Sequence, residues 1–165
     1  MSWSYYLVVT LHVLAALLWL GGMFFLGVVG APVLRAVEPP ALRQQLFHLL
    51  GVRFRTAGWI AIGVLVVTGT IMLRARGLLA WSGVLGAAAF WRTPLGVALA
   101  FKLAAVATMI TVSAVHDFIV GPAASRSAAG SPEAVALRRR AALLARLNAL
   151  VGLILVVAAV RLARG

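Results

Sequence analysis

Cysteine is absent from this chain of 165 residues, and acidic side chains are scarce. The lack of cysteine excludes disulfides, thiolate zinc sites and cysteine-bound iron–sulfur clusters, and it removes the best ligand for monovalent copper. The three acidic residues, Glu38, Asp117 and Glu133, stand against fifteen lysines and arginines, so the formal net charge is +12. Composition alone therefore excludes the cofactor classes that depend on cysteine.

Long apolar runs dominate what is present. The hydrophobic fraction is 64% and the mean hydropathy is +1.08, whereas a soluble domain is roughly half apolar. The basic residues flank the apolar runs, where they meet lipid headgroups rather than nucleic acid. The chain is therefore predicted to be an integral membrane protein that has the lipid bilayer, and no nucleic acid, as a partner.

Four segments are long enough to cross about 30 Å of hydrocarbon. They are Tyr5–Val29, Ala57–Leu73, Leu95–Val120 and Ala141–Leu162. The N-terminal run lacks a basic region and is too long for a signal peptide, so we interpret it as a retained first span. Because a lipid-exposed span must satisfy its own backbone, all four should be helices. We predict an all-α, four-helix membrane bundle, formed as a single domain over residues 1–165.

Proline marks several predicted helix boundaries. Thr93-Pro94 and Ser131-Pro132 each place a capping hydroxyl before a proline, so helices should begin there. Gly121-Pro122 should end the third span. The segment "PALRQQLFHLLGVRFR" has leucines at helical spacing between arginines, which predicts an amphipathic helix on the inner membrane surface. No strong internal repeat is evident.

Two predicted spans carry polar or polarizable residues along one line of the helix. Positions seven, eleven or fourteen apart lie near one meridian, and such a meridian should face the bundle interior. The first span places three residues in this way and the third span places four: His12, Trp19 and Met23, and Lys102, Met109, Ser113 and His116. Each of the two spans therefore has a face, directed to the bundle interior, whose side chains are suited to binding a ligand.

Depth separates the candidate residues into two groups. His12 and Lys102 lie early in parallel spans, with Met72 at similar depth, and form an outer group. The second, inner group lies about 20 Å deeper along the helix axis. It consists of His116, Asp117 and His48, with Arg53, Arg55, Met23 and Met109 nearby. His12 and His116 are therefore predicted to be too far apart to bind one iron.

Structural roles for the same residues stay open at this stage. A histidine inside a membrane bundle can serve only to hydrogen-bond one helix to another. Lys102 can extend to the headgroups, and His116 and Asp117 lie within a turn of the surface where water reaches them. His48 can be a solvated interfacial residue, and the methionines can be core filler. Sequence alone does not decide between these roles and ligand binding.

Three quoted stretches carry a family resemblance. "LHVLAALLWLGGMFFLGVVGAPVLR", "RFRTAGWIAIGVLVVTGTIMLRARG" and "LGVALAFKLAAVATMITVSAVHDFIVGP" resemble the first three helices of the copper-resistance protein D (CopD)-like superfamily. That superfamily includes HemJ-like relatives, in which a histidine of the first helix and a lysine of a later helix matter and heme b is bound. His12 and Lys102 match these positions. The resemblance implies a cytochrome b-like bundle that holds heme between helices.

Three functions follow as hypotheses. The first is a heme b protein of redox or electron-transfer function, with one axial site per leaflet, His12 or His116 as ligand, and arginines such as Arg55 for the propionates. The second is a copper transport or resistance permease using Met23, Met109 and His116. The third is a cofactor-free accessory subunit. A homo-oligomer, a larger membrane complex and a quinone stay open as partners, and enzymatic activity stays open.

Charge asymmetry predicts the orientation in a bacterial-type inner membrane. The loops after spans one and three carry nine arginines, whereas the opposite face carries five. By the positive-inside rule both termini should be extracytoplasmic.

Cysteine labelling tests this orientation. In intact cells an impermeant reagent should label Gly165→Cys and should not label Ser127→Cys. Labelling of Ser127→Cys alone would overturn the orientation and leave the four-helix fold intact.

Overall fold

The structure is a computed structural model that describes residues 2–79, 84–128 and 131–164. Four helical stretches in it are long and apolar enough to cross a membrane: Trp3–Arg35, Pro40–Ala75, Pro94–Arg126 and Pro132–Ala159. The prediction of an all-α membrane bundle is therefore confirmed.

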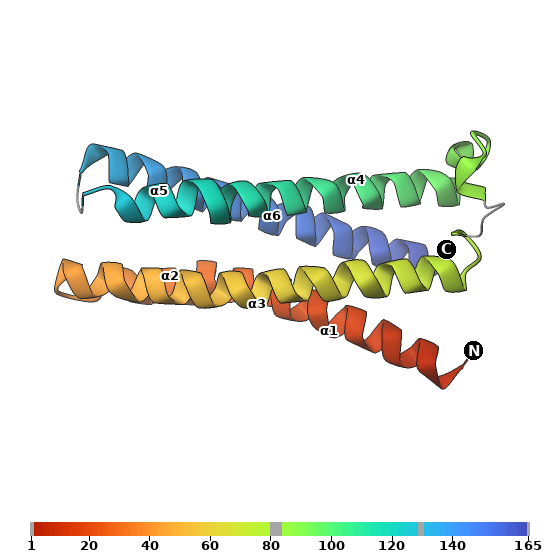
Figure 1. The fold of residues 1–165 in the computed structure, drawn as a ribbon, viewed down its shortest axis with the longest axis horizontal. Helices are drawn as coiled ribbons and strands as arrows, with labels where there is room; N and C mark the ends of the chain where they lie inside the picture. Colours follow the sequence, from red (N-terminus) through yellow and green to blue (C-terminus); the bar gives the residue numbers. More distant parts are fainter. Residues whose placement is uncertain (1, 80–83, 129–130, 165) are drawn as a thin grey trace.

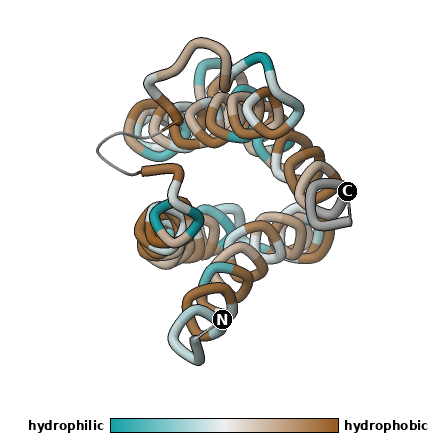
Figure 2. Tube along the Cα trace, turned by 90° about the vertical axis from the view of Figure 1, so that its right-hand side faces the viewer, coloured by the Kyte–Doolittle hydropathy of each residue, from teal (hydrophilic) through white to brown (hydrophobic). Residues whose placement is uncertain are grey.

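The four spans form two helical hairpins (Figure 1). In the first, α1 (Trp3–Phe25) packs against α3 (Pro40–Ala75). In the second, α4 (Pro94–Ala114) packs against α6 (Pro132–Arg164). Contacts between α1 and α6 join the two hairpins, which surround a common axis in the end-on view of Figure 2. Both termini lie at one end, the N/C end, and both hairpin turns lie at the other, the hairpin end (Figure 1).

Two helix starts agree with the predicted capping residues. The Thr93 hydroxyl accepts a hydrogen bond from the Gly96 backbone N–H at 3.1 Å, and the Ser131 hydroxyl accepts one from Ala134 at 3.1 Å. Each hydroxyl satisfies an N–H group that has no partner within its helix.

The amphipathic segment from Pro40 to Arg55 is helical as expected, but it is not a separate interfacial helix. It forms the first turns of α3, which runs from Pro40 to Ala75 without a break. Between Ala41 and Ala75 the sequence has no proline, and its glycines do not interrupt the backbone hydrogen bonds. The second span is therefore much longer than predicted.

The expectation that Gly121-Pro122 ends the third span is wrong. The helix widens into a π-helical segment, η4 (Val115–Val120), and then continues as α5 (Gly121–Arg126). Proline has no N–H and its ring clashes with the carbonyl four residues back. A bond from the preceding residue, Gly121, to the carbonyl of His116 five residues back accommodates the ring without ending the helix.

The first span repeats this construction, which sequence inspection missed. A π-helical segment, η1 (Leu26–Gly30), precedes α2 (Ala31–Arg35), and Ala31 donates to the carbonyl of Leu26 just before Pro32. Both spans contain 33 residues. His12 precedes Pro32 by 20 residues, and Lys102 precedes Pro122 by 20 residues. The two candidate outer residues therefore occupy equivalent positions in the two hairpins.

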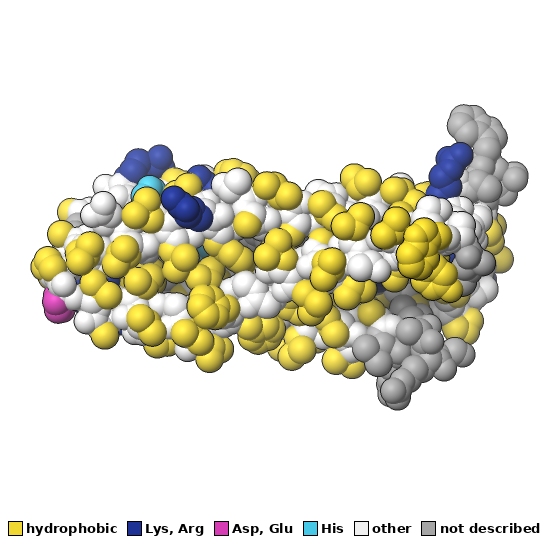
Figure 3. Space-filling view, turned by 90° about the horizontal axis from the view of Figure 1, so that it is seen from below, with side chains coloured by type: hydrophobic (Ala, Val, Ile, Leu, Met, Phe, Trp, Pro, Cys, Tyr) yellow, Lys and Arg dark blue, Asp and Glu magenta, His cyan; other side chains and the backbone are white. Residues whose placement is uncertain are grey.

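Burial is limited to small clusters, as expected for a bundle whose outer surface meets lipid. The central cluster contains Ala15, Trp19, Ala61, Ile62 and Met109. A second cluster near the N/C end contains Leu78, Phe90 and Leu99. On the face shown in Figure 3, apolar side chains cover the middle of the molecule and the cationic side chains lie toward its two ends. This distribution fits a bilayer-spanning orientation.

Gly96 provides a test of packing at the N/C end. A Cβ at this position would overlap the Phe90 carbonyl oxygen and lie 2.8 Å from the carbonyl carbon. Gly96→Ala should therefore destabilise the detergent-solubilised protein by about 1–3 kcal/mol in thermal unfolding. Gly51→Ala is the control, because a Cβ there meets no atom within 4 Å. Equal stability of the two variants would contradict the packing at Gly96.

Candidate functional site

The outer candidate, His12, is tied to the second span. His12 lies on α1 and is half-buried, and its Nδ1 atom lies 2.8 Å from the hydroxyl oxygen of Thr68 on α3. The Thr68 hydroxyl donates its own hydrogen to the backbone carbonyl of Val64. Thr68 can therefore only accept from His12, so the proton is on Nδ1 and the electron pair of the ring is on Nε2. For an axial His12, sequence alone offers either Thr10 or a threonine of the second span as the acceptor, and the structure brings Thr68 of the second span to this position.

Space around the imidazole comes from a small neighbour. A Cβ on Gly69 would lie 3.5 Å from His12 Cε1, so even the smallest side chain would be in van der Waals contact with the ring. Thr68 is 5% exposed, so its bond to His12 is protected from water.

Two cations lie in the same half of the bundle as this histidine. Lys102 on α4 is half-buried, and Arg76 lies at the end of α3. The three acidic residues of the chain all lie toward the hairpin end. The N/C half of the bundle therefore carries cationic side chains with no acidic side chain to balance them, which favours an anionic group.

The inner candidate, His116, forms a different pair. Its Nδ1 atom lies 2.7 Å from Oδ1 of Asp117, within η4. The other carboxylate oxygen, Oδ2, accepts a hydrogen bond from Nε1 of Trp59 on α3 at 3.0 Å. The carboxylate is thus held between an imidazole on one hairpin and an indole on the other. Because Nδ1 is bonded to Asp117, a neutral His116 has only Nε2 left for a ligand.

Arg55 is positioned by the missing N–H of Pro122. In a π-helical segment the carbonyl of Asp117 would pair with the nitrogen of Pro122, five residues ahead, which carries no hydrogen. The Arg55 guanidinium donates to this carbonyl instead, at 3.2 Å, and lies 5.9 Å from the centre of the Phe118 ring. Arg55 therefore contacts the inner group, and it links α3 to η4.

A third polar cluster lies between the two histidines. The side chain of Asn148 on α6 donates to the Ser113 hydroxyl at 2.8 Å and approaches the Met23 sulfur at 3.9 Å. Asn148 is 5% exposed, and its Oδ1 atom has no hydrogen-bond partner. Met109 packs in the same region, because its methyl group would lie 3.6 Å from a Cβ at Gly152, one turn along α6. Met23, Met109 and Asn148 thus share one buried region.

The remaining candidate residues lie outside these hydrogen-bonded clusters. His48 and Arg53 are exposed on α3, and within the described residues no hydrogen bond joins His48 to His116. Met72 is half-buried on α3. Across residues 2–79, 84–128 and 131–164, no group of three histidine, aspartate or glutamate side chains is arranged to hold a metal ion.

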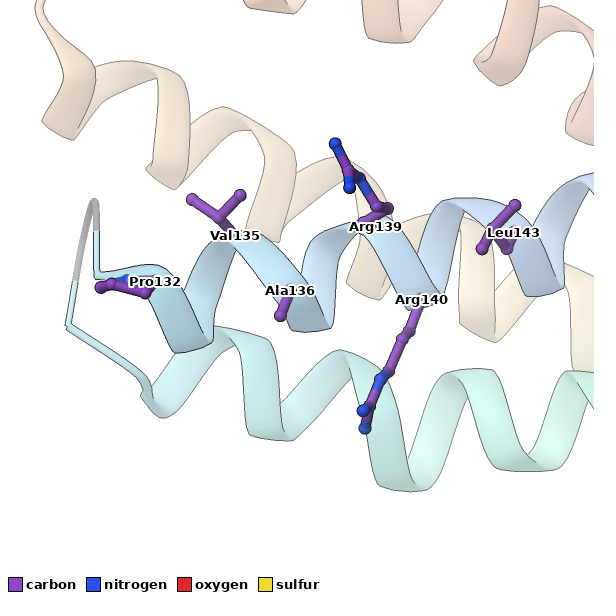
Figure 4. Close-up of a pocket in the computed structure, with 6 residues that line it drawn as sticks. All are labelled: Pro132, Val135, Ala136, Arg139, Arg140 and Leu143. Carbon is purple, nitrogen blue, oxygen red and sulfur yellow. The ribbon is translucent and has the colours of Figure 1, made fainter.

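A shallow surface hollow on α6 near the hairpin end does not form a site. All six lining residues belong to one helix, and Arg139 and Arg140 project to different sides of it (Figure 4). The lining residues are Pro132, Val135, Ala136, Arg139, Arg140 and Leu143. Without side chains converging from a second element, a ligand has little to hold it there.

Two residues of these clusters escaped sequence analysis. Trp59 follows Arg55 by four positions and so lies on the same face of α3, a spacing that could have connected it to the inner group. Asn148 is the single amide in the apolar stretch "LNALVGLILVV", and a lone amide in a span usually faces the interior.

Comparison with known proteins yields one uncharacterized relative. The chain is 40% identical over 62 residues to an uncharacterized protein of Aquifex aeolicus (strain VF5). The match covers 37% of this chain and 42% of that protein, so the chain spans less than half of its length. No family model and no solved structure match the chain.

The unpaired oxygen of the Asn148 amide leads to a prediction about the stability of two variants. Asn148→Leu removes an unpaired buried acceptor, so it should cost less than about 1 kcal/mol or stabilise the protein. Ser113→Ala leaves the buried amide with one partner fewer and should cost about 1–3 kcal/mol. Thermal unfolding in detergent measures both variants. A larger loss for Asn148→Leu than for Ser113→Ala would contradict this account of the cluster.

Proposed function

We propose that this protein is an integral membrane heme b protein with a redox or electron-transfer function, and that it belongs to the CopD-like superfamily that its first three helices resemble. His12 is the axial ligand of an outer heme site. Bound heme b would supply a one-electron couple of iron inside the bilayer.

The observation that carries this proposal is the bond between His12 Nδ1 and the Thr68 hydroxyl. A histidine that ligates a metal almost always donates its other ring nitrogen to a carboxylate, carbonyl or hydroxyl, which orients the ring. Because the Thr68 proton is given to Val64, His12 keeps the tautomer with an electron pair on Nε2. The imidazole therefore has both the protonation and the support that an axial ligand requires.

The residues in the same half of the bundle as His12 also fit heme b. Heme b has two carboxylates, and Lys102 and Arg76 are cations in the same half of the bundle as His12, which has no acidic side chain. Heme needs apolar walls, and most residues of α1 and α4 are apolar. Lys102 would then be balanced by a propionate rather than left uncompensated in hydrocarbon.

The proposal places the protein in a bacterial-type inner membrane with both termini extracytoplasmic, on the basis of the arginine asymmetry. Redox partners would be a membrane quinone or the other subunits of a larger complex or homo-oligomer.

Copper transport is the second candidate. Met23 and Met109 pack in one buried region, and thioether sulfur is a ligand that monovalent copper accepts. His116, the third ligand of this hypothesis, is hydrogen-bonded to Asp117. The third candidate is a cofactor-free accessory subunit, in which the same polar contacts serve only to hold the helices together.

One purification separates these functions. The visible spectrum and the metal content of the same detergent-purified sample should show a Soret band with iron. Stoichiometric copper without a Soret band would favour the transporter, and neither would favour the accessory subunit.

The ligand assignment has its own test. His12→Ala should abolish or reshape the heme spectrum, whereas Leu11→Ala, at a lipid-facing position that is 53% exposed, should not. Thr68→Val should weaken heme retention by about 10–100-fold through loss of the supporting hydrogen bond. Thr70→Val is its control, because Thr70 donates only to the carbonyl of Val66. A full wild-type spectrum in His12→Ala would return His12 to a purely structural role.

A further inference from the structure

The hydrogen bonds that join the two hairpins are absent from the N/C half of the described residues. Asp117 of the second hairpin accepts hydrogen bonds from Trp59 and Arg55 of the first, at 3.0 and 3.2 Å. We call these three residues the Asp117 contact. Nearer the hairpin turns, Arg138 donates to Gln44 at 3.5 Å on the surface of the molecule. Polar contacts between the hairpins are therefore concentrated in the hairpin half.

Apolar packing joins the hairpins at the middle of the bundle and at the N/C end. The central cluster contains Ala61 of the first hairpin and Met109 of the second. At the N/C end the chain passes from α3 to α4 (Figure 1), and Leu73 of α3 packs against the cluster that contains Leu99 of α4. Water that enters between apolar surfaces costs free energy in proportion to their area, whereas water can replace most of a hydrogen bond between polar groups. The hairpin half is therefore the half in which water can separate the hairpins.

Polar groups follow one side of the third span from the hairpin end to the middle. Met109 belongs to the central cluster, Ser113 accepts a hydrogen bond from Asn148 at 2.8 Å, and Asp117 bonds to the first hairpin. The three residues of this span are four positions apart, so they lie close to one face of the helix. A polar route thus leads inward from the Asp117 contact and stops at the central cluster.

Asn148, at the inner end of this route, has an acceptor that the bundle leaves unsatisfied. Its side chain is 5% exposed and donates to Ser113, but Oδ1 has no hydrogen-bond partner. A buried carbonyl oxygen without a partner costs the free energy of removing it from water. An arrangement of the helices that admits water would supply the missing donor, so the unpaired oxygen favours such an arrangement.

Two further features of the hairpin half favour separation of the hairpins. In this half the first hairpin has four arginines and one acidic residue, and the second has five arginines and two acidic residues. The two hairpins therefore repel each other at this end. The first and third spans also each contain a π-helical segment and a proline here, which are the places where long helices bend.

We infer that the two hairpins separate in the hairpin half, pivoting about the central cluster and the N/C end, and that this opening admits water to a site at Ser113 and Asn148. Oδ1 of Asn148 is the acceptor for the bound water. The Asp117 contact holds the closed arrangement. Because the central cluster ends the route, water reaches the middle of the bundle from the hairpin end only. This opening requires no cofactor.

Single-thiol labelling tests the opening, since the chain has no cysteine of its own. Full-length Ser113→Cys in nanodiscs is treated with a small charged methanethiosulfonate, which reacts with thiols that water reaches, and should react slowly. Trp59→Phe keeps an aromatic ring and removes one bond to the carboxylate, so it should raise the labelling rate about tenfold. Trp3→Phe is the control, because Trp3 is 81% exposed at the N/C end.

A charge-matched pair of variants tests the other bond of the Asp117 contact. Arg55→Met removes the donor to the Asp117 carbonyl and should also raise the labelling rate. Arg53→Met removes the same charge from an exposed residue of the same helix and should leave the rate unchanged.

Two further cysteines control the labelling itself. Leu147→Cys is next to Asn148 in the sequence, at a lipid-facing position that is 48% exposed, and should stay unreactive in every background. Met23→Cys is a second reporter at the same polar cluster, because the Met23 sulfur lies 3.9 Å from the Asn148 amide nitrogen. It replaces Ser113→Cys if that variant does not fold.

Spin-label distances locate the pivot. Labels at Gln45 and Arg140, which are exposed near the turns of the first and second hairpins, should move apart in Trp59→Phe. Labels at Ile71 and Val97, which are exposed in the N/C half, should keep their distance.

The outcomes are separable from those of the proposed function, because the spectrum and metal content of the protein do not enter them. Equal labelling of the reporter cysteine with and without Trp59→Phe and Arg55→Met would overturn the role of the Asp117 contact. A larger distance change in the N/C half than near the turns would overturn the pivot. Faster labelling of Leu147→Cys in the same variants would show general loosening and overturn the opening.

Discussion

The missing N–H groups of Pro32 and Pro122 are the constraint on which the inner half of this bundle depends. Inside a bilayer every backbone carbonyl needs a donor, because no water replaces one that is lost. Each proline is accommodated by a π-helical segment, in which the residue before it bonds to the carbonyl five residues back. In the second hairpin the carbonyl left without a backbone donor belongs to Asp117, and the Arg55 guanidinium donates a hydrogen bond to it. A local backbone defect thereby becomes a contact between hairpins.

That contact determines the chemistry of the neighbouring side chains. With its backbone held by Arg55, Asp117 presents one carboxylate oxygen to Trp59 and the other to His116. In the N/C half, the bond from His12 to Thr68 lies within the first hairpin, and its acceptor carries no charge. The bundle thus supports two imidazoles with different acceptors, a carboxylate near the hairpin turns and a hydroxyl in the N/C half.

Sequence patterns predicted the spans well because a membrane span is a local property of composition and length. They also predicted the caps at Thr93 and Ser131, since a hydroxyl before a proline acts within one turn. The same reasoning was wrong about Gly121-Pro122, because a proline ends a helix only when its neighbours cannot shift their hydrogen-bond register. It also separated residues 40–55 from the second span, since amphipathic character indicates where a helix meets water and not where it is interrupted.

By itself the sequence determined the class of the protein: an all-α membrane bundle with histidines at two depths, a lysine at the level of one of them and no cysteine chemistry. It offered Thr10 or a threonine of the second span as the hydroxyl acceptor of His12. Only the tertiary structure decided that this threonine is Thr68, that Trp59 holds Asp117, and that Asn148 lies between Ser113 and Met23 with half of its amide unpaired. These pairings join residues on different helices, and the crossing of the helices, which depends on side-chain packing along their whole length, sets which of them meet.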